Sequence, residues 1–127
     1  MKYMGIGDEA ANNIDGQIQA TQELGWKLLE PRGVEVPGFA KANFHDIPDV
    51  AFDLAVRKLE AAGINAYCFG STIMNWAKKL SDPFDITLAE VKRAIPRMQR
   101  ARAKYVRIMS FKPEDDACVI PAEVFRR

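Results

Sequence analysis

The feature that most constrains this chain is a junction at which an amphipathic helix ends and an apolar strand begins within two residues. In residues 52–62 apolar side chains recur every three or four positions, which places them on one face of a helix. Gly63 follows, and glycine readily adopts the left-handed conformation that ends many helices. Residues 64–69 are then short and apolar, as expected of a strand buried on both faces of a parallel sheet. The stretch therefore predicts half of a βαβ unit.

The same junction occurs twice more, around Gly25 and around Arg102. The three positions lie 38 and 39 residues apart (25 to 63 and 63 to 102), which indicates a repeated unit of one helix and one strand. Arginine at the third junction would be strained if that helix also ends in a left-handed residue. The pattern predicts strands at 2–7, 26–30, 64–69 and 104–111, helices at 14–24, 52–62 and from 88, and a helical turn from 121.

Two further sequence features refine this outline. Thr87 and Glu90 have the spacing of a capping box, which places the start of the third helix at Leu88. The connections at residues 32–47 and 70–85 are long for loops of this kind, and long loops often carry function.

The order of elements, βαβαβαβ, is the first half of an eightfold (β/α) barrel. We therefore predict an α/β fold in which residues 1–127 form one domain of four parallel βα units, a half-barrel that ends as its fourth helix begins. A complete TIM barrel needs about 250 residues. The alternative is an open, flavodoxin-like sheet that binds a small anion, which a reversal of the strand order would reveal.

The charge balance argues against whole classes of partner. Eighteen Lys and Arg against 17 Asp and Glu give a formal charge of +1, so no bulk field favours nucleic acid or an anionic membrane. A basic run at residues 92–104 is either a solvated helix face or a contact for a phosphate or a partner. Near the N-terminus a G-x-G sequence lacks the third glycine of a dinucleotide fingerprint, and the acidic pair Asp8 and Glu9 would repel a pyrophosphate.

The two cysteines, Cys68 and Cys118, have no metal-ligand or redox spacing, which favours reduced thiols in the cytoplasm. The sequence has no secretory signal and no apolar run of the roughly 18 residues that span a bilayer. We therefore expect a cytoplasmic protein with no membrane partner.

Candidate binding residues follow from the barrel geometry, because residues at the carboxyl ends of barrel strands face the mouth of the barrel. A long loop adds one histidine to them. The candidate substrate-binding residues are Glu9, Glu30, Arg32, His45, Cys68, Phe69, Ser71 and Ser110.

Three of these candidates have an alternative structural role. Glu30 either contacts a substrate or forms an ion pair with Arg32 or Arg107 that orders the barrel. Cys68 is either at the mouth or a small buried apolar residue. His45, the only histidine, either orders its loop and helps to cap the next helix or acts over a pocket as a substrate contact or acid–base group.

Five motifs in fixed order narrow the functional class: M-G-I-G-D-E-A, E-L-G-W-K-L-L-E-P-R, V-P-G-F-A-K-A-N-F-H-D-I-P-D, C-F-G-S-T-I-M-N-W-A-K-K and Y-V-R-I-M-S-F. Together they resemble the amino-terminal half of the xylose isomerase-like TIM-barrel proteins, the sugar phosphate isomerase/epimerase group that includes AP-endonuclease relatives. The resemblance implies isomerisation or epimerisation of a sugar or polyol. It also implies a divalent cation (Mn, Mg, Co or Zn) that stabilises an enediolate while a proton is moved.

In that family the metal ligands come chiefly from strands five to eight, which this sequence does not contain. We therefore expect no metal ligand and no activity from this chain alone, and we name no catalytic residue. A second hypothesis is a non-catalytic assembly module, because a half-barrel exposes two strand edges and an apolar interior. Such a module would form a homo-oligomer or bind a complementary half-barrel.

Overall fold

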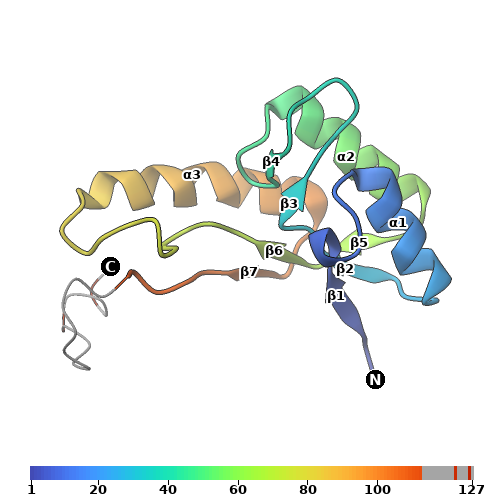
Figure 1. Cartoon of the computed structure of the whole chain (residues 1–127), viewed down its shortest axis with the longest axis horizontal. Helices are drawn as coiled ribbons and strands as arrows, with labels where there is room; N and C mark the ends of the chain where they lie inside the picture. The colour runs from blue at the N-terminus through green and yellow to red at the C-terminus, as the bar shows by residue number, and fades with distance from the viewer. Residues whose placement is uncertain (113–121, 123–125, 127) are drawn as a thin grey trace.

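The computed structural model describes residues 1–112, 122 and 126. Cys118 and the helical turn predicted from residue 121 lie outside the described residues. The described part is a mixed α/β fold with three α-helices and parallel strands (Figure 1). No helix among the described residues is both long and apolar enough to cross a bilayer.

The parallel strands follow one another in chain order. β1 (Met4–Ile6), β2 (Leu28–Glu30) and β5 (Asn65–Ala66) form one sheet in the order β1-β2-β5. β6 (Cys68–Gly70) pairs in parallel with β7 (Tyr105–Arg107). Neither described sheet contains the reversal of strand order that a flavodoxin-like fold requires.

The predicted third strand is broken into β5 and β6 by a local bulge. Its backbone N–H groups at residues 65, 67 and 70 donate to the carbonyls of residues 27, 29 and 31. Between the second and third of these hydrogen bonds, the third strand advances three residues (67 to 70) while β2 and the residue after it advance two (29 to 31). The third strand therefore has one extra residue here, as in a β-bulge. β6 therefore continues alongside the end of β2, although the two are assigned to separate sheets.

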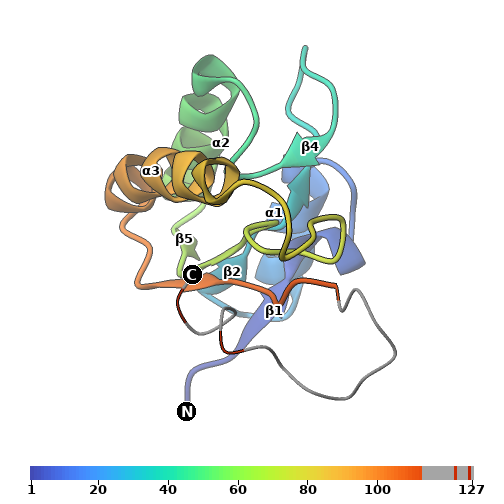
Figure 2. The same cartoon turned by 90° about the vertical axis from the view of Figure 1, so that its left-hand side faces the viewer.

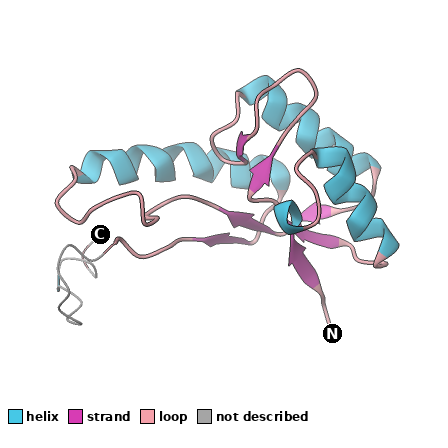
Figure 3. Ribbon diagram, in the orientation of Figure 1, coloured by secondary structure: helices cyan, strands magenta, loops and turns pink. Residues whose placement is uncertain are grey.

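The three helices lie on one side of these strands (Figures 2 and 3). They are α1 (Ile14–Glu23), α2 (Asp49–Ala61) and α3 (Phe84–Ala101). The main core lies between helices and strands, and its centre is a cluster of three rings, Phe44, Phe52 and Phe69, with centroids 4.9 to 6.2 Å apart. Burial of these large side chains provides much of the driving force for the fold.

The opposite face of the strands is covered by no described helix. Leu29 and Val106 belong to the core, and side chains alternate along a strand, so their neighbours point the other way. We call this surface the open face, and its residues are Met4, Ile6, Leu28, Glu30, Tyr105 and Arg107. Met4 is 37% exposed and Tyr105 is 51% exposed.

All three helices end in the same way, as the repeated junction predicts. Gly25 and Gly63 have φ of +67°, and Arg102 has φ of +54°, so each occupies the left-handed region. In each case the following N–H group donates to a carbonyl five residues earlier: Trp26 to Thr21, Ile64 to Leu59 and Ala103 to Met98.

Several predicted boundaries are wrong. α3 begins at Phe84, four residues before the predicted start, and Thr87 is buried inside it. Pro83 precedes the helix and Asp85 lies in its first turn, and together they favour an earlier start than the capping box. The connection after β2 contains an unpredicted antiparallel pair, β3 (Gly33–Val34) and β4 (Ala42–Asn43).

Candidate functional site

A carboxylate and a guanidinium meet at the carboxyl ends of the strands, on the open face. Glu30 ends β2 and Arg107 ends β7, and Arg107 Nε donates to Glu30 Oε1 over 2.6 Å. Gly70 lies between them on β6, where an added Cβ would be 2.9 Å from Glu30 Oε1 and 3.2 Å from Arg107 Nη2. Glycine at this position therefore makes room for the ion pair. We call Glu30, Arg107, Gly70 and Cys68 the Glu30–Arg107 cluster.

Cys68 completes this cluster as a neutral thiol. Burial raises its pKa, and the nearby Glu30 carboxylate raises it further. A thiol that keeps its proton is a poor nucleophile and a poor metal ligand. Cys68 is 7% exposed, so it contributes apolar volume beside the ion pair.

A second ion-pair cluster lies at the ends of β1 and β2. Arg32 Nε donates to both oxygens of Asp8, over 2.9 and 3.0 Å, and its Nη2 donates to Glu9 over 2.5 Å. Asp8 also accepts from the Gly33 N–H group over 3.1 Å. The hydrogen bond with Asp8 is the main cause that raises the pKa of Arg32. We call Arg32, Asp8 and Glu9 the Arg32 cluster, and the two clusters together the strand-end site.

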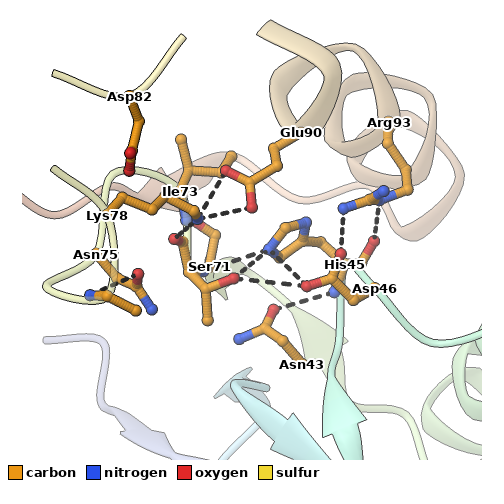
Figure 4. Close-up of polar contacts among 12 residues, drawn as sticks. Asn43, His45, Asp46, Ser71, Ile73, Asn75, Lys78, Asp82, Glu90 and Arg93 are labelled. Atoms are coloured by element: carbon orange, nitrogen blue, oxygen red, sulfur yellow. Dashed lines mark hydrogen bonds and ion pairs between the residues drawn. The ribbon is translucent and has the colours of Figure 1, made fainter. Parts of the chain in front are cut away.

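His45 lies in a separate polar network between the two long connections (Figure 4). Its side chain is fully buried. Its Nε2 accepts from the Thr72 backbone N–H group over 3.3 Å and lies 3.0 Å from Thr72 Oγ1 and 3.5 Å from Asp46 Oδ2. Asn43 Oδ1 accepts from the His45 N–H group over 3.2 Å.

These contacts determine what His45 can do chemically. A backbone N–H group only donates, so Nε2 is the acceptor and a neutral ring carries its proton on Nδ1. Nδ1 is buried and has no partner in the described structure. Burial is the main cause that lowers the pKa of His45; Arg93 and Lys78 lower it further, while Asp46 and Glu90 oppose them. His45 is therefore a neutral core residue whose basic nitrogen is already used.

The same network holds both long connections against α3. Arg93 forms an ion pair with Asp46 and donates to the His45 carbonyl over 3.1 Å. Lys78 Nζ donates to both oxygens of Glu90, over 2.6 and 2.8 Å. These contacts join the loop before α2 and the loop after β6 to one helix.

The basic run of α3 has a role that the sequence did not indicate. Arg97 Nη2 donates to Asp49 over 2.5 Å, and its Nη1 donates to the His45 carbonyl over 2.8 Å. Arg100 pairs with Glu60 over 2.9 Å and lies 3.5 Å from Asp53. With Arg93, three of the run's cations therefore connect α3 to α2 or to the loop before it.

The remaining predicted residues lie elsewhere. Phe69 is in the core between strands and helices. Ser71 is buried, and its Oγ donates to the Arg107 carbonyl over 2.7 Å and accepts from the Ile73 N–H group over 3.2 Å. Ser110 is exposed beyond β7 and joins neither cluster. The strand-end site thus contains Glu9, Glu30, Arg32 and Cys68 of the predicted set.

Sequence reasoning missed Asp8 and Gly70 as parts of this site and named Arg107 only as an alternative ion-pair partner. A signal for Arg107 exists, because it is a charged residue at an alternate position of an apolar strand. The sequence indicates Asp8 only as an acidic residue that would repel a pyrophosphate.

The strand-end site does not fit the divalent cation that the sequence resemblance implies. Within the described ranges, no group of three or more His, Cys, Asp and Glu side chains could hold a metal ion. A guanidinium already binds both oxygens of Asp8 and Oε1 of Glu30, so these carboxylates are neutralised by arginine.

In the part of the chain that the structure describes, grooves lie beside α1 and α2, and the two described below are not lined by Glu30 or Arg107. One, of about 500 Å³, lies between the carboxyl ends of α2 and α3, where Gly63, Asn65 and Arg102 contribute to its lining. The other, of about 280 Å³, lies between β1 and α1.

Comparisons with protein-family models, with curated proteins and with solved structures find no match to this chain.

Proposed function

We propose that this chain supplies a sugar- or polyol-binding half of a (β/α)₈ barrel of the isomerase and epimerase type. One observation carries the proposal: the Glu30–Arg107 pair, joined over 2.6 Å, lies at the carboxyl ends of parallel strands on the face that no described helix covers. In a closed barrel that position faces the mouth, where barrel enzymes bind their substrates.

The chemistry of the pair suits a polyhydroxy compound. A sugar hydroxyl donates one hydrogen bond and accepts others, so a carboxylate and a guanidinium side by side complement two neighbouring hydroxyls. The Arg32 cluster repeats this arrangement at the neighbouring strand ends. We assign to these residues the binding and orientation of the substrate.

The proton transfer of an isomerase requires groups outside those described. The carboxylates of the strand-end site are held by arginines, and we derive no metal-dependent step from them. We propose that the groups completing the reaction belong to the strands that close the barrel.

Ligand-detected NMR with D-fructose, D-xylose and sorbitol tests the binding. We expect binding to the chain and a loss of about tenfold in affinity in Glu30→Gln, because a hydrogen bond to a charged group contributes about 1.5 kcal/mol. Glu23→Gln removes the same charge at the end of α1, remote from the site, and is the matched control. Circular dichroism verifies that both variants fold. Absence of binding, or equal affinity in both variants, would contradict the proposal.

A second candidate function, self-association, is favoured by the open face. Met4 and Tyr105 are exposed large apolar residues on that face, and in the described part β1 and β7 each pair on one edge only. Free strand edges and exposed apolar patches promote association. Two copies related by a twofold axis would place β7 of each beside β1 of the other.

Sedimentation equilibrium tests this candidate. We expect a dimer at micromolar concentration and a shift towards monomer in Met4→Lys with Tyr105→Lys, because both side chains are exposed and the charges oppose burial. Val50→Lys, at an exposed apolar position of α2, is the control. A folded monomer at micromolar concentration in the unsubstituted chain would refute self-association.

A further inference from the structure

The charges at the strand-end site are balanced. Arg32 is held by Asp8 and Glu9, and Arg107 is held by Glu30. A third cation described near the site, Lys41, donates from Nζ to Asn12 Oδ1 over 2.7 Å, and its Cε would lie 3.2 Å from a Cβ on Gly33. Three carboxylates therefore meet three cations: Asp8, Glu9 and Glu30 against Arg32, Arg107 and Lys41.

The amino-terminal ends of the helices, which commonly bind phosphate groups, already carry acidic residues. Helices that follow parallel strands begin at the strand-end side of the sheet, and their free N–H groups and dipoles attract anions. Here each first turn contains an aspartate: Asp15 in α1, Asp49 in α2 and Asp85 in α3. In α1 the Asn13 side chain also accepts from the Gly16 N–H group, over 2.7 Å. Lys58 pairs with Asp15 and Arg97 with Asp49, so these two helix ends have no surplus charge of either sign, and Asp85 adds a carboxylate to the first turn of α3.

The basic residues of the neighbouring network do not change this balance. Arg93 pairs with Asp46, Arg97 with Asp49 and Lys78 with Glu90. Each cation is held by a carboxylate, so the network adds no surplus positive charge.

One polar atom at the site requires an acceptor. Arg107 Nη2 is buried, and no described group accepts its hydrogen bonds. An unpaired buried donor costs about 1 to 3 kcal/mol, so a movement of the Arg107 side chain that brings Nη2 to a ligand oxygen would be stabilising. A hydroxyl or carbonyl oxygen accepts that bond without adding a charge to the balanced site.

We propose that the strand-end site takes an uncharged polyhydroxy ligand, a free sugar or polyol, and discriminates against its phosphate ester. The inference rests on the proposed function, because it assumes that a sugar binds at the Glu30–Arg107 cluster. A phosphate monoester brings a charge of about −1.5 to −2 at neutral pH, and the balanced side chains of the strand-end site offer no surplus positive charge to compensate for it.

Ligand-detected NMR with D-fructose and D-fructose 6-phosphate tests the proposal on the full chain. We expect the neutral sugar to bind at least about tenfold more tightly, a difference of about 1.4 kcal/mol. Because the site has no net charge, this difference should change little when the salt is raised from 0.01 M to 0.15 M, although the screening length falls from about 30 Å to about 8 Å.

A charge variant shows whether electrostatics cause the preference. Glu9→Gln leaves Arg32 with one carboxylate fewer, so the preference for the neutral sugar over the ester should fall several-fold. Glu23→Gln carries the same change at the far end of α1 and should leave the preference unaltered.

The outcomes separate the two proposals. Tighter binding of the neutral sugar than of the ester, with a smaller difference in Glu9→Gln, supports both the proposed function and this inference. Equal or tighter binding of the ester overturns this inference while leaving sugar binding intact. Binding of neither compound contradicts the proposed function and the inference with it. An equal loss of preference in Glu9→Gln and Glu23→Gln overturns the assignment to the strand-end charges.

Discussion

Arg102 follows α3 at the backbone position that Gly25 and Gly63 occupy after α1 and α2. Its φ of +54° is in the left-handed region, where a residue with a Cβ is disfavoured by about 1 to 2 kcal/mol. The hydrogen bond from the next residue to Met98 still forms, over 2.9 Å, so the junction keeps its geometry at an energetic cost.

Arg102→Gly should therefore stabilise the chain. We expect the free energy of unfolding to rise by about 1 kcal/mol, since relief of strain exceeds the added freedom of the unfolded chain. Arg102→Ala keeps the Cβ and should give no such gain. Urea denaturation measures both variants, and equal stability of the two would show that the strain is absent.

His45 links stability to pH. Burial holds its pKa below the ordinary value of 6.5, so the unfolded chain binds a proton more readily than the folded chain. The contribution of this residue to stability is fully present above pH 6.5. It is lost progressively as the pH falls towards the folded pKa, with a slope of up to about 1.4 kcal/mol per pH unit.

Denaturation midpoints between pH 5 and 8 check this expectation. The chain has no other histidine, so a fall in stability that begins near pH 6.5 is assigned to His45. His45→Gln should be less stable at pH 8 and should show a smaller fall below pH 6.5. A midpoint of the unsubstituted chain that stays constant from pH 8 to 5.5 would contradict the lowered pKa.

Residue types and positions predicted part of the strand-end site, but not its pairings. Glu30 could be predicted at the carboxyl end of a strand because it ends an apolar stretch before Pro31 and Arg32. Its partner, Arg107, is 77 residues away, and only the side-by-side position of β2 and the third and fourth strands brings them together. The burial of His45 was equally hidden, because its partners belong to another loop and to α3.

At the level of elements, ion pairs connect α3 to α2. Arg97 is 8% exposed, and its guanidinium lies 5.0 Å from the centre of the Phe52 ring besides donating to Asp49 and to the His45 carbonyl. Arg100 is more exposed, and its partners Glu60 and Asp53 are also exposed. Exposed ion pairs contribute little to stability, while buried donors to a carbonyl contribute more.

Arg97→Ala should accordingly destabilise the chain by about 2 kcal/mol, because it removes a buried charged hydrogen bond and the packing on Phe52. Arg100→Ala is the matched control and should have a much smaller effect. Thermal unfolding of the two variants compares them directly. A larger loss in Arg100→Ala would refute this view of the helix contact.

Helices and strands could be predicted from the sequence where the same local pattern of residues occurs more than once. The sequence predicts three junctions at which an amphipathic helix ends and an apolar strand begins. The structure confirms all three helix ends, each with a residue in the left-handed conformation. The bulge at the third strand and the β3–β4 pair depend on contacts between distant residues, so no local pattern reports them. The start of α3 was misplaced because Pro83 and Asp85 compete with a capping box, and propensity alone does not decide between them.

At the level of the whole molecule, the helices lie on one side of the strands (Figure 1). Glu30 and Arg107 alternate along their strands with the core residues Leu29 and Val106, so their side chains point to the other side. The described strands follow one another without reversal, as successive strands of a barrel do. In the half-barrel that we propose, the open face would be the inside of the barrel and its charged end the mouth.

We propose that a sugar or polyol binds on this face at the strand ends. Amide chemical-shift mapping during titration with D-fructose tests this binding directly. We expect shifts at Glu30, Gly70 and Arg107 that are lost in Glu30→Gln. Shifts confined to Gly63, Asn65 and Arg102, in the groove between α2 and α3, would contradict it.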